Sequence, residues 1–146
     1  MSINNNKKLT FFHPVLDSEI RIPLIKEGVS AGFPSPAIDF MEVGIDLNTE
    51  LCKNPLATFY IKVKGNSMID AGINDDDVLV VDRSLEPKNN TIAICFIDGE
   101  FTVKRIQLEK DCLYLIPENP SYLPIKVTED NQLIIWGIVT YVIKAL

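Results

Sequence analysis

Apolar and polar residues alternate with a period of two from residue 58 onward, and this pattern limits the possible folds more than any other. In the first such segment, Phe59, Ile61 and Val63 alternate with a tyrosine and two lysines. Successive side chains of a strand point to opposite faces, so this segment predicts a half-buried strand. Further strands are expected over residues 78–81, 91–97, 100–108, 114–116, 125–127 and 133–144. Many short strands at close spacing predict a mostly β fold that is compact and antiparallel.

The N-terminal part of the chain has a different character. Its apolar segments are interrupted by Pro14 and Pro23, which cannot donate a hydrogen bond within a sheet. We therefore expect an extended arm, residues 1–31, that lies on a β domain formed by residues 32–146. Residues 28–34 between them are small and turn-prone, which predicts an accessible linker.

One or two short helices are expected where the domain begins. Ser35 is a suitable N-cap, Pro36 suits the first helical position, and Gly44 supplies a stop. A second short helix is predicted to start at Asp46 and to end before Asn54.

The charge and hydropathy of the chain exclude several classes of function. A net charge of −6, with cations spread along the sequence, argues against direct sequence-specific binding of nucleic acid. No run approaches the ~18 consecutive apolar residues that a membrane-spanning helix needs. The N-terminus also lacks the apolar stretch of a secretory signal, so a cytoplasmic location is expected.

Cysteine and histidine usage argues against a metal site and a disulfide framework. The three cysteines, Cys52, Cys95 and Cys112, are far apart and form no C-x-x-C pair. We expect each of them to be a small buried apolar residue. His13 is the sole histidine, which excludes a site with two histidine ligands.

The first segment with catalytic potential is Gly65-Asn66-Ser67-Met68, directly after a predicted strand. A serine that follows a glycine-containing turn can present its hydroxyl beside free backbone N–H groups. A nucleophile and an oxyanion hole need these parts. Taken alone, the segment fits ordinary turn chemistry at least as well.

The second segment is Thr102-Val103-Lys104, within a predicted strand. At an unperturbed pKa of ~10.4, only about one lysine in a few thousand is neutral at pH 7. Burial lowers a lysine pKa, so a lysine held inside an apolar sheet can act as a general base. The alternative for this segment alone is a lysine whose amine extends into solvent.

Together the two segments resemble the LexA/UmuD family of self-cleaving serine proteases. In that family a Gly-x-Ser-Met turn supplies a serine and a Thr-Val-Lys strand supplies a lysine. The stretch from Gly32 to Ala37 is similar to the family's cleavage region, and the segment from Asp98 to Lys104 resembles its UmuD branch. The resemblance covers about residues 28–146 and implies the family's β-rich catalytic domain.

The resemblance also implies roles for particular residues. Ser67 would be the nucleophile and Lys104 the general base, with Thr102 supporting the lysine. The backbone N–H groups of Asn66 and Ser67 would form the oxyanion hole. The bond that is cut would join Ala31 to Gly32, where UmuD itself has a cysteine in place of the alanine. No cofactor and no metal would be needed.

Partners follow from the resemblance alone. UmuD-like proteins are cytoplasmic homodimers whose self-cleavage is stimulated by a RecA filament on single-stranded DNA during the SOS response. The shortened form joins a UmuC-like subunit in an error-prone translesion DNA polymerase. The arm before Ala31 lacks a helix-turn-helix pattern, so a complete repressor is not expected.

Three other functions have weaker support in the sequence. A non-catalytic β-rich module that binds a polymerase would use Ser67 as a turn residue and Lys104 as a surface charge. A signal-peptidase-like enzyme would need a membrane anchor, and a Ser-His-Asp hydrolase would depend on His13, in the proline-interrupted arm.

The run Asp75-Asp76-Asp77 lacks the ligand spacing of an EF-hand and predicts a solvated turn.

Overall fold

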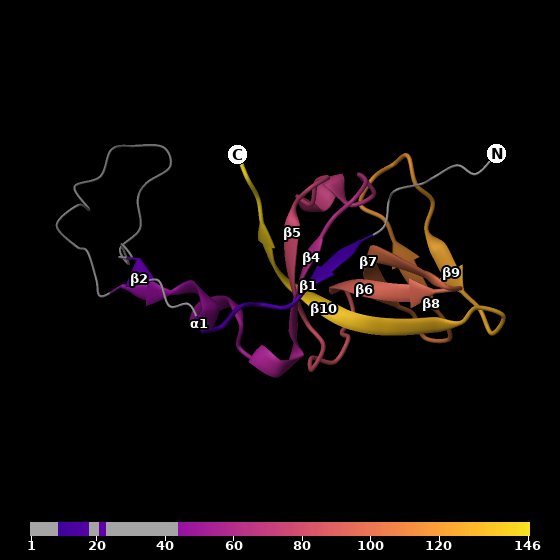
Figure 1. The fold of residues 1–146 in the computed structure, drawn as a ribbon. Helices are drawn as coiled ribbons and strands as arrows, with labels where there is room; N and C mark the ends of the chain where they lie inside the picture. Colours follow the sequence, from indigo (N-terminus) through magenta and orange to yellow (C-terminus); the bar gives the residue numbers. More distant parts are fainter. Residues whose placement is uncertain (1–8, 18–20, 23–43) are drawn as a thin grey trace.

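A computed structural model describes residues 9–17, 21–22 and 44–146 of the chain (Figure 1). The predicted helix after Ser35, the linker 28–34 and the Ala31–Gly32 bond lie outside the described residues.

The main body is one eight-stranded sheet in which every neighbouring pair is antiparallel. In spatial order its strands are β1 (Thr10–Phe12), β4 (Thr58–Lys62), β5 (Val78–Asp82), β10 (Leu133–Ile143), β6 (Ile92–Ile97), β7 (Glu100–Leu108), β8 (Leu113–Ile116) and β9 (Ile125–Val127). The predicted mostly β, antiparallel fold is confirmed, and each strand predicted from residue 58 onward is present.

Short elements precede β4 or lie between β4 and β5. The α-helix α1 (Leu47–Leu51) is capped by the side chain of Asp46, which accepts a hydrogen bond from the N–H of Asn48. This matches the second predicted helix. The 3₁₀ helices are η2 (Pro55–Ala57) and η3 (Ile69–Ala71). Strands β2 (Arg21–Ile22) and β3 (Ile45–Asp46) form a separate pair, which the sequence pattern did not predict.

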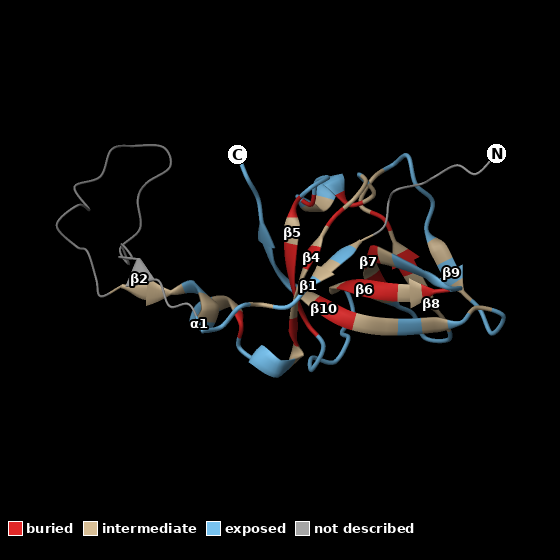
Figure 2. Ribbon diagram, in the orientation of Figure 1, coloured by how far each residue is buried: buried red, intermediate tan, exposed pale blue. Residues whose placement is uncertain are grey.

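The core consists of two clusters that both contain residues of β6. The first includes Ile61, Leu79, Ile94 and Val103, and the second includes Ala93, Cys95, Ile106 and Leu115. Figure 2 shows buried residues concentrated on β5, β6 and the neighbouring parts of β4, β7 and β10. Alternate residues of β6 therefore face different clusters, as expected for a strand buried on both faces.

The sheet curves so that strands far apart in its order approach each other. Between β4 and β7 lie three strands, which in a flat sheet would separate them by about 19 Å at ~4.8 Å per step. Yet Val63, directly after β4, packs in the same cluster as Val103 of β7. Strand β10 contributes to this curvature through two register shifts, one between Ile135 and Gly137 and one between Val139 and Tyr141.

The burial of the cysteines and of the aspartates 75–77 agrees only in part with the predictions. Cys52 and Cys95 are buried as predicted, whereas Cys112 is half-buried. Asp75 and Asp76 are exposed, but the prediction of a solvated turn is wrong for Asp77, which is buried. Its carboxylate pairs with the Lys144 ammonium and accepts a hydrogen bond from the N–H of Asn74 at 2.8 Å. These partners offset the cost of removing the charge from water.

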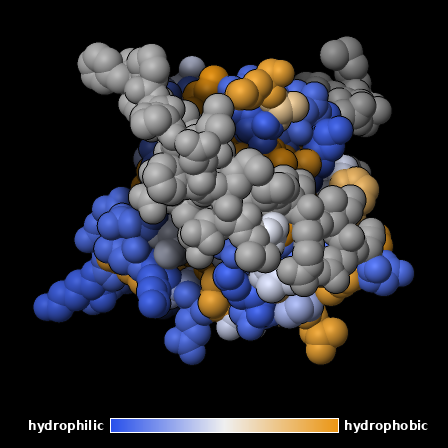
Figure 3. Space-filling view, turned by 90° about the vertical axis from the view of Figure 1, so that its left-hand side faces the viewer, coloured by the Kyte–Doolittle hydropathy of each residue, from blue (hydrophilic) through white to orange (hydrophobic). Residues whose placement is uncertain are grey.

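Where the face in Figure 3 is coloured, it carries mostly hydrophilic side chains, with apolar ones in separate groups. Within the described residues, no helix combines the length and the apolar character that crossing a membrane requires.

Candidate active site

Ser67 lies in a tight turn between β4 and η3. Gly65 enters this turn with a φ of 98°, a conformation that suits glycine, and its N–H donates to the Asp75 carboxylate at 2.7 Å. Met68, next to the serine, is only 2% exposed and packs in the first core cluster. The turn is thus anchored on both sides of Ser67 while the serine itself stays half-buried.

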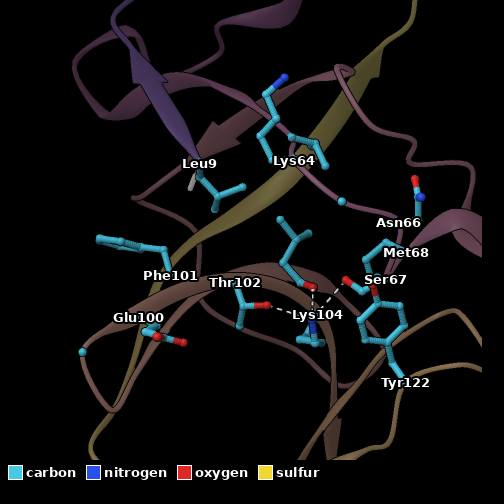
Figure 4. Close-up of a pocket in the computed structure, with 14 residues that line it drawn as sticks. Leu9, Lys64, Asn66, Ser67, Met68, Glu100, Phe101, Thr102, Lys104 and Tyr122 are labelled. Carbon is cyan, nitrogen blue, oxygen red and sulfur yellow. Dashed lines mark hydrogen bonds between the residues drawn. The ribbon is translucent and has the colours of Figure 1, made fainter. Parts of the chain in front are cut away.

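Lys104 extends from β7 toward this serine (Figure 4). Its amine nitrogen Nζ lies 3.1 Å from Ser67 Oγ, 2.7 Å from Thr102 Oγ1 and 3.1 Å from the carbonyl oxygen of Val103. The lysine is 7% exposed, so its amine does not extend into solvent as in the alternative interpretation. The structure therefore brings Ser67, Thr102 and Lys104 together within hydrogen-bond distance.

Burial lowers the pKa of Lys104 because the charged amine loses its hydration. Cys95 lies on β6, opposite Thr102 of β7. A negative charge on its thiol would raise the pKa of Lys104. However, burial also raises the pKa of Cys95 to about 12, which keeps the thiol neutral near pH 7. In the described part of the chain, no carboxylate forms an ion pair with Lys104.

When charged, Lys104 can donate to all three of its partners, and when neutral it can still satisfy each of them. A neutral amine has two N–H donors and one lone pair. The N–H groups can donate to Thr102 Oγ1 and the Val103 carbonyl, which leaves the lone pair to accept the hydroxyl proton of Ser67. This arrangement has the chemical features of a nucleophile beside its general base.

A cavity of about 450 Å³ opens in front of this pair. It is lined by the turn 63–68, by the β6–β7 turn and the start of β7 (residues 99–104), by Leu9 and by Tyr122. Figure 4 shows Ser67 and Lys104 facing each other in this cavity, with Tyr122 beside the serine. The cavity can admit an extended segment of polypeptide to the hydroxyl.

The predicted oxyanion-hole groups lie in the same turn. Among the described residues, no hydrogen bond uses the backbone N–H of Asn66, Ser67 or Met68. These donors border the cavity and remain available to an incoming oxygen.

Sequence reasoning missed the segment 117–124 between β8 and β9, which contributes Tyr122 to the cavity and also contacts the serine turn. It missed Leu9 too, although an arm lying on the body was expected. No spacing or composition signal marks either position. Ala31 and Gly32, the predicted cleavage site, lie outside the described residues. In the part of the chain that the structure describes, no group of three His, Cys, Asp or Glu residues is placed to hold a metal ion.

Comparison with known proteins shows which family the chain resembles. A family model described as Peptidase S24-like matches residues 23–140. Protein SamA of Salmonella typhimurium is 45% identical over 118 residues, which make up 81% of this chain and 81% of SamA. Protein ImpA of Escherichia coli is 41% identical over 128 residues, 87% of this chain and 86% of ImpA. The LexA repressor of Alcanivorax borkumensis is 40% identical over 126 residues, 86% of this chain and 60% of the repressor.

The family model covers most of the chain, including both Ser67 and Lys104. SamA and ImpA match over most of their own length, whereas the LexA repressor extends well beyond the matched region. The chain therefore belongs to the LexA/UmuD, Peptidase S24-like family of serine proteases, in which it is a UmuD-like member.

Proposed function

We propose that this protein is a self-cleaving serine protease of the SOS response, in which Ser67 and Lys104 form a catalytic dyad that hydrolyses the chain's own Ala31–Gly32 bond. The observation that carries the proposal is the 3.1 Å approach of a 7% exposed lysine amine to a serine hydroxyl. Lowering the pKa of a buried lysine makes its lone pair available at a lower pH than in an exposed lysine, and a general base requires this lone pair.

The reaction begins when neutral Lys104 accepts the hydroxyl proton of Ser67 and Oγ attacks the carbonyl carbon of Ala31. The N–H groups of Asn66 and Ser67 stabilise the resulting oxyanion. When the bond to Gly32 breaks, the Lys104 ammonium returns its proton to the leaving amine. Water then hydrolyses the ester between Ala31 and Ser67, which frees the Ala31 carboxylate and restores the serine. Thr102 supports this cycle by holding the amine at 2.7 Å.

The contacts of the described N-terminal residues support access of this segment to the dyad. Strand β1 pairs with β4 on the body, and Leu9 lines the cavity in front of Ser67. Part of the region before residue 32 thus already lies at the rim of the candidate site. Ala and Gly at the cut bond are small, so an extended segment can enter a narrow cavity without a clash.

The family membership supports a proposal for the biological setting. We propose a cytoplasmic homodimer whose self-cleavage is stimulated by a RecA filament on single-stranded DNA. The remaining domain, residues 32–146, then acts as an accessory subunit of an error-prone translesion polymerase together with a UmuC-like protein. The relatives SamA and ImpA, which match over more than four fifths of their length, support this setting rather than that of a repressor.

The test is to incubate the purified chain at pH 10 and to measure the masses of the fragments. We expect fragments 1–31 and 32–146, and we expect Ser67→Ala and Lys104→Met each to slow cleavage at least about 1,000-fold. Matched controls are Ser121→Ala and Lys126→Met, two exposed residues outside the dyad that should cleave like the wild type. Release of the arm from Ser67→Ala at the wild-type rate would rule out the proposal. A wild-type chain that is never cut would leave a non-catalytic interaction module as the function.

A further inference from the structure

The segment 117–124 between β8 and β9 is attached to the turn that carries Ser67 at two points. The side-chain nitrogen Nδ2 of Asn119 donates to the carbonyl oxygen of Asn66 at 2.8 Å. The N–H of Asp70 donates to the carbonyl oxygen of Glu118, also at 2.8 Å. These bonds join residues that are far apart in sequence, and one of them ends on the peptide group directly before the nucleophile.

The orientation of the Asn119 amide follows from its own contacts. Its Oδ1 accepts a hydrogen bond from the N–H of Ser121 at 2.9 Å, so the NH₂ group is the one directed at Asn66. The Asn119 carbonyl accepts the N–H of Tyr122 at 3.1 Å, which closes the segment into a turn. The neighbouring Glu118 carboxylate pairs with Arg105 on β7, the residue after Lys104. The residue before Asn119 is therefore joined to the strand that supplies the lysine.

One bond to the Asn66 carbonyl controls a different group, the N–H of Ser67. The carbonyl of residue 66 and the N–H of residue 67 belong to one planar trans peptide group and point in opposite directions. Holding the carbonyl toward Asn119 therefore fixes the Ser67 N–H on the other side. The Ile69 N–H also reaches the Asn66 oxygen, but at 3.3 Å, so the Asn119 bond is the shorter of the two.

We propose that Asn119 is a positioning residue of the self-cleavage reaction, which holds the Asn66–Ser67 peptide so that the Ser67 N–H faces the developing oxyanion. The inference rests on the proposed function of Ser67 and Lys104. Asn66 is exposed, and its turn is not paired with a strand of the sheet. The Asn66–Ser67 peptide group therefore needs a contact from another segment to keep one orientation. An oxyanion hole is effective only when its donors are oriented before the charge forms.

Two substitutions separate this role from general support of the fold. Asn119→Asp keeps an oxygen for the Ser121 N–H but cannot donate to Asn66, and Asn119→Ala removes both contacts. The matched control is Asn54→Ala, which deletes another side-chain amide that joins two segments, with Nδ2 donating to Asp82 at 2.7 Å. Self-cleavage rates are measured from pH 6 to pH 11 on the full chain, together with the thermal unfolding midpoint of each variant.

We expect both Asn119 variants to cleave about 10- to 100-fold more slowly than the wild type at every pH, less than the loss caused by deleting an oxyanion-hole donor outright. The pH midpoint of the rate should stay unchanged in Asn119→Ala, because Lys104 keeps its environment, whereas the new carboxylate of Asn119→Asp can raise it. Asn54→Ala should cleave at the wild-type rate. Should Asn119→Ala fail to fold, the rate of Asn119→Asp on the high-pH plateau, where Lys104 is neutral, carries the test.

Two results would overturn the inference. Wild-type rates in the Asn119 variants would show that the bond to Asn66 has no part in the reaction. A slower rate accompanied by a shifted pH midpoint in Asn119→Ala, which adds no charge, would show that Asn119 acts on the lysine or on the fold instead. Both results are distinct from failure of the proposed function, in which the wild-type chain itself is not cut or is cut without Ser67.

Discussion

Lys104 has an environment that opposes its usual charge. Its amine is removed from water, and the polar groups within reach are two hydroxyls and a carbonyl rather than a carboxylate. Hydrogen bonds to neutral acceptors stabilise an ammonium less than an ion pair does. Burial therefore outweighs these contacts, and the pKa of the lysine falls.

This lowered pKa has a consequence for stability. In the pH range between the pKa of folded Lys104 and the unfolded value of ~10.4, the unfolded chain binds more protons, so the free energy of unfolding increases with pH. Lys104→Met removes this titration, and the former partners Ser67 and Thr102 line the cavity. We expect the variant to be more stable at pH 7 by on the order of 1 kcal/mol.

The measurement is chemical denaturation of Lys104→Met against wild type at pH 7 and pH 10.5, in a Ser67→Ala background that prevents cleavage. The stability gain of the methionine variant should shrink as the pH increases. A gain of equal size at both pH values would mean that the charge of Lys104 costs the fold nothing.

Among single residues, the chemistry-bearing ones were the most predictable. Ser67, Thr102 and Lys104 lie in two short motifs, and the second motif lies within a strand that the sequence predicts. The burial of Asp77 was not predictable, because its partner Lys144 is far away in sequence. Asn119 was missed for the same reason, since its role depends on a contact between distant segments.

Strand β10 is the element on which the curvature of the sheet depends most. It pairs with β6 through its first half and with β5 through its second, and a register shift at Gly137 lies where the pairing changes. A Cβ atom at Gly137 would lie 2.6 Å from Val81 Cγ1 and 3.3 Å from Arg83 Cγ. The close approach of β5 and β10 therefore requires glycine at this position.

We expect Gly137→Ala to destabilise the protein by about 1–3 kcal/mol through overpacking. Urea denaturation measures this change. Ile134→Thr is the control on the same strand, because Ile134 is 58% exposed, and it should change the stability by no more than about 0.5 kcal/mol. An alanine variant as stable as the wild type would mean that β5 and β10 can separate without cost.

Strands were predicted well where apolar and polar residues alternate, as in β4, or where apolar residues form a continuous run, as in β6. The two-residue strands β2 and β3 are too short to show a period, so only their backbone pairing identifies them. The curvature that brings β4 near β7 was also outside the reach of the sequence, because it follows from bulges and strand order rather than from local composition.

In the molecule as a whole, strand β1 covers an aromatic group on the body. Phe11 packs edge-to-face on Phe101, with ring centroids 4.9 Å apart, and on Trp136 at 5.0 Å. Trp136 also contacts Phe59 at 5.0 Å, and the Arg83 guanidinium lies 4.4 Å from its ring. Loss of residues 1–31 would remove Phe11 and leave the half-buried Trp136 more open to water.

Because Trp136 is the one tryptophan of the chain, its fluorescence reports this change directly. We expect the emission maximum to move to longer wavelength as cleavage proceeds and the arm leaves. Phe11→Ala in an uncleaved Ser67→Ala background should produce a shift in the same direction. Emission that stays constant through complete cleavage would indicate that β1 remains on the body.

The central claim is that Lys104 acts as a neutral base for Ser67, and the pH dependence of the self-cleavage rate tests it most directly. We predict that the first-order rate increases about tenfold per pH unit and then levels off, with a midpoint below the ordinary lysine pKa of ~10.4. In Lys104→Met this rise should disappear along with the activity. A Lys104→Met variant that cleaves with the same pH profile as the wild type would contradict the account.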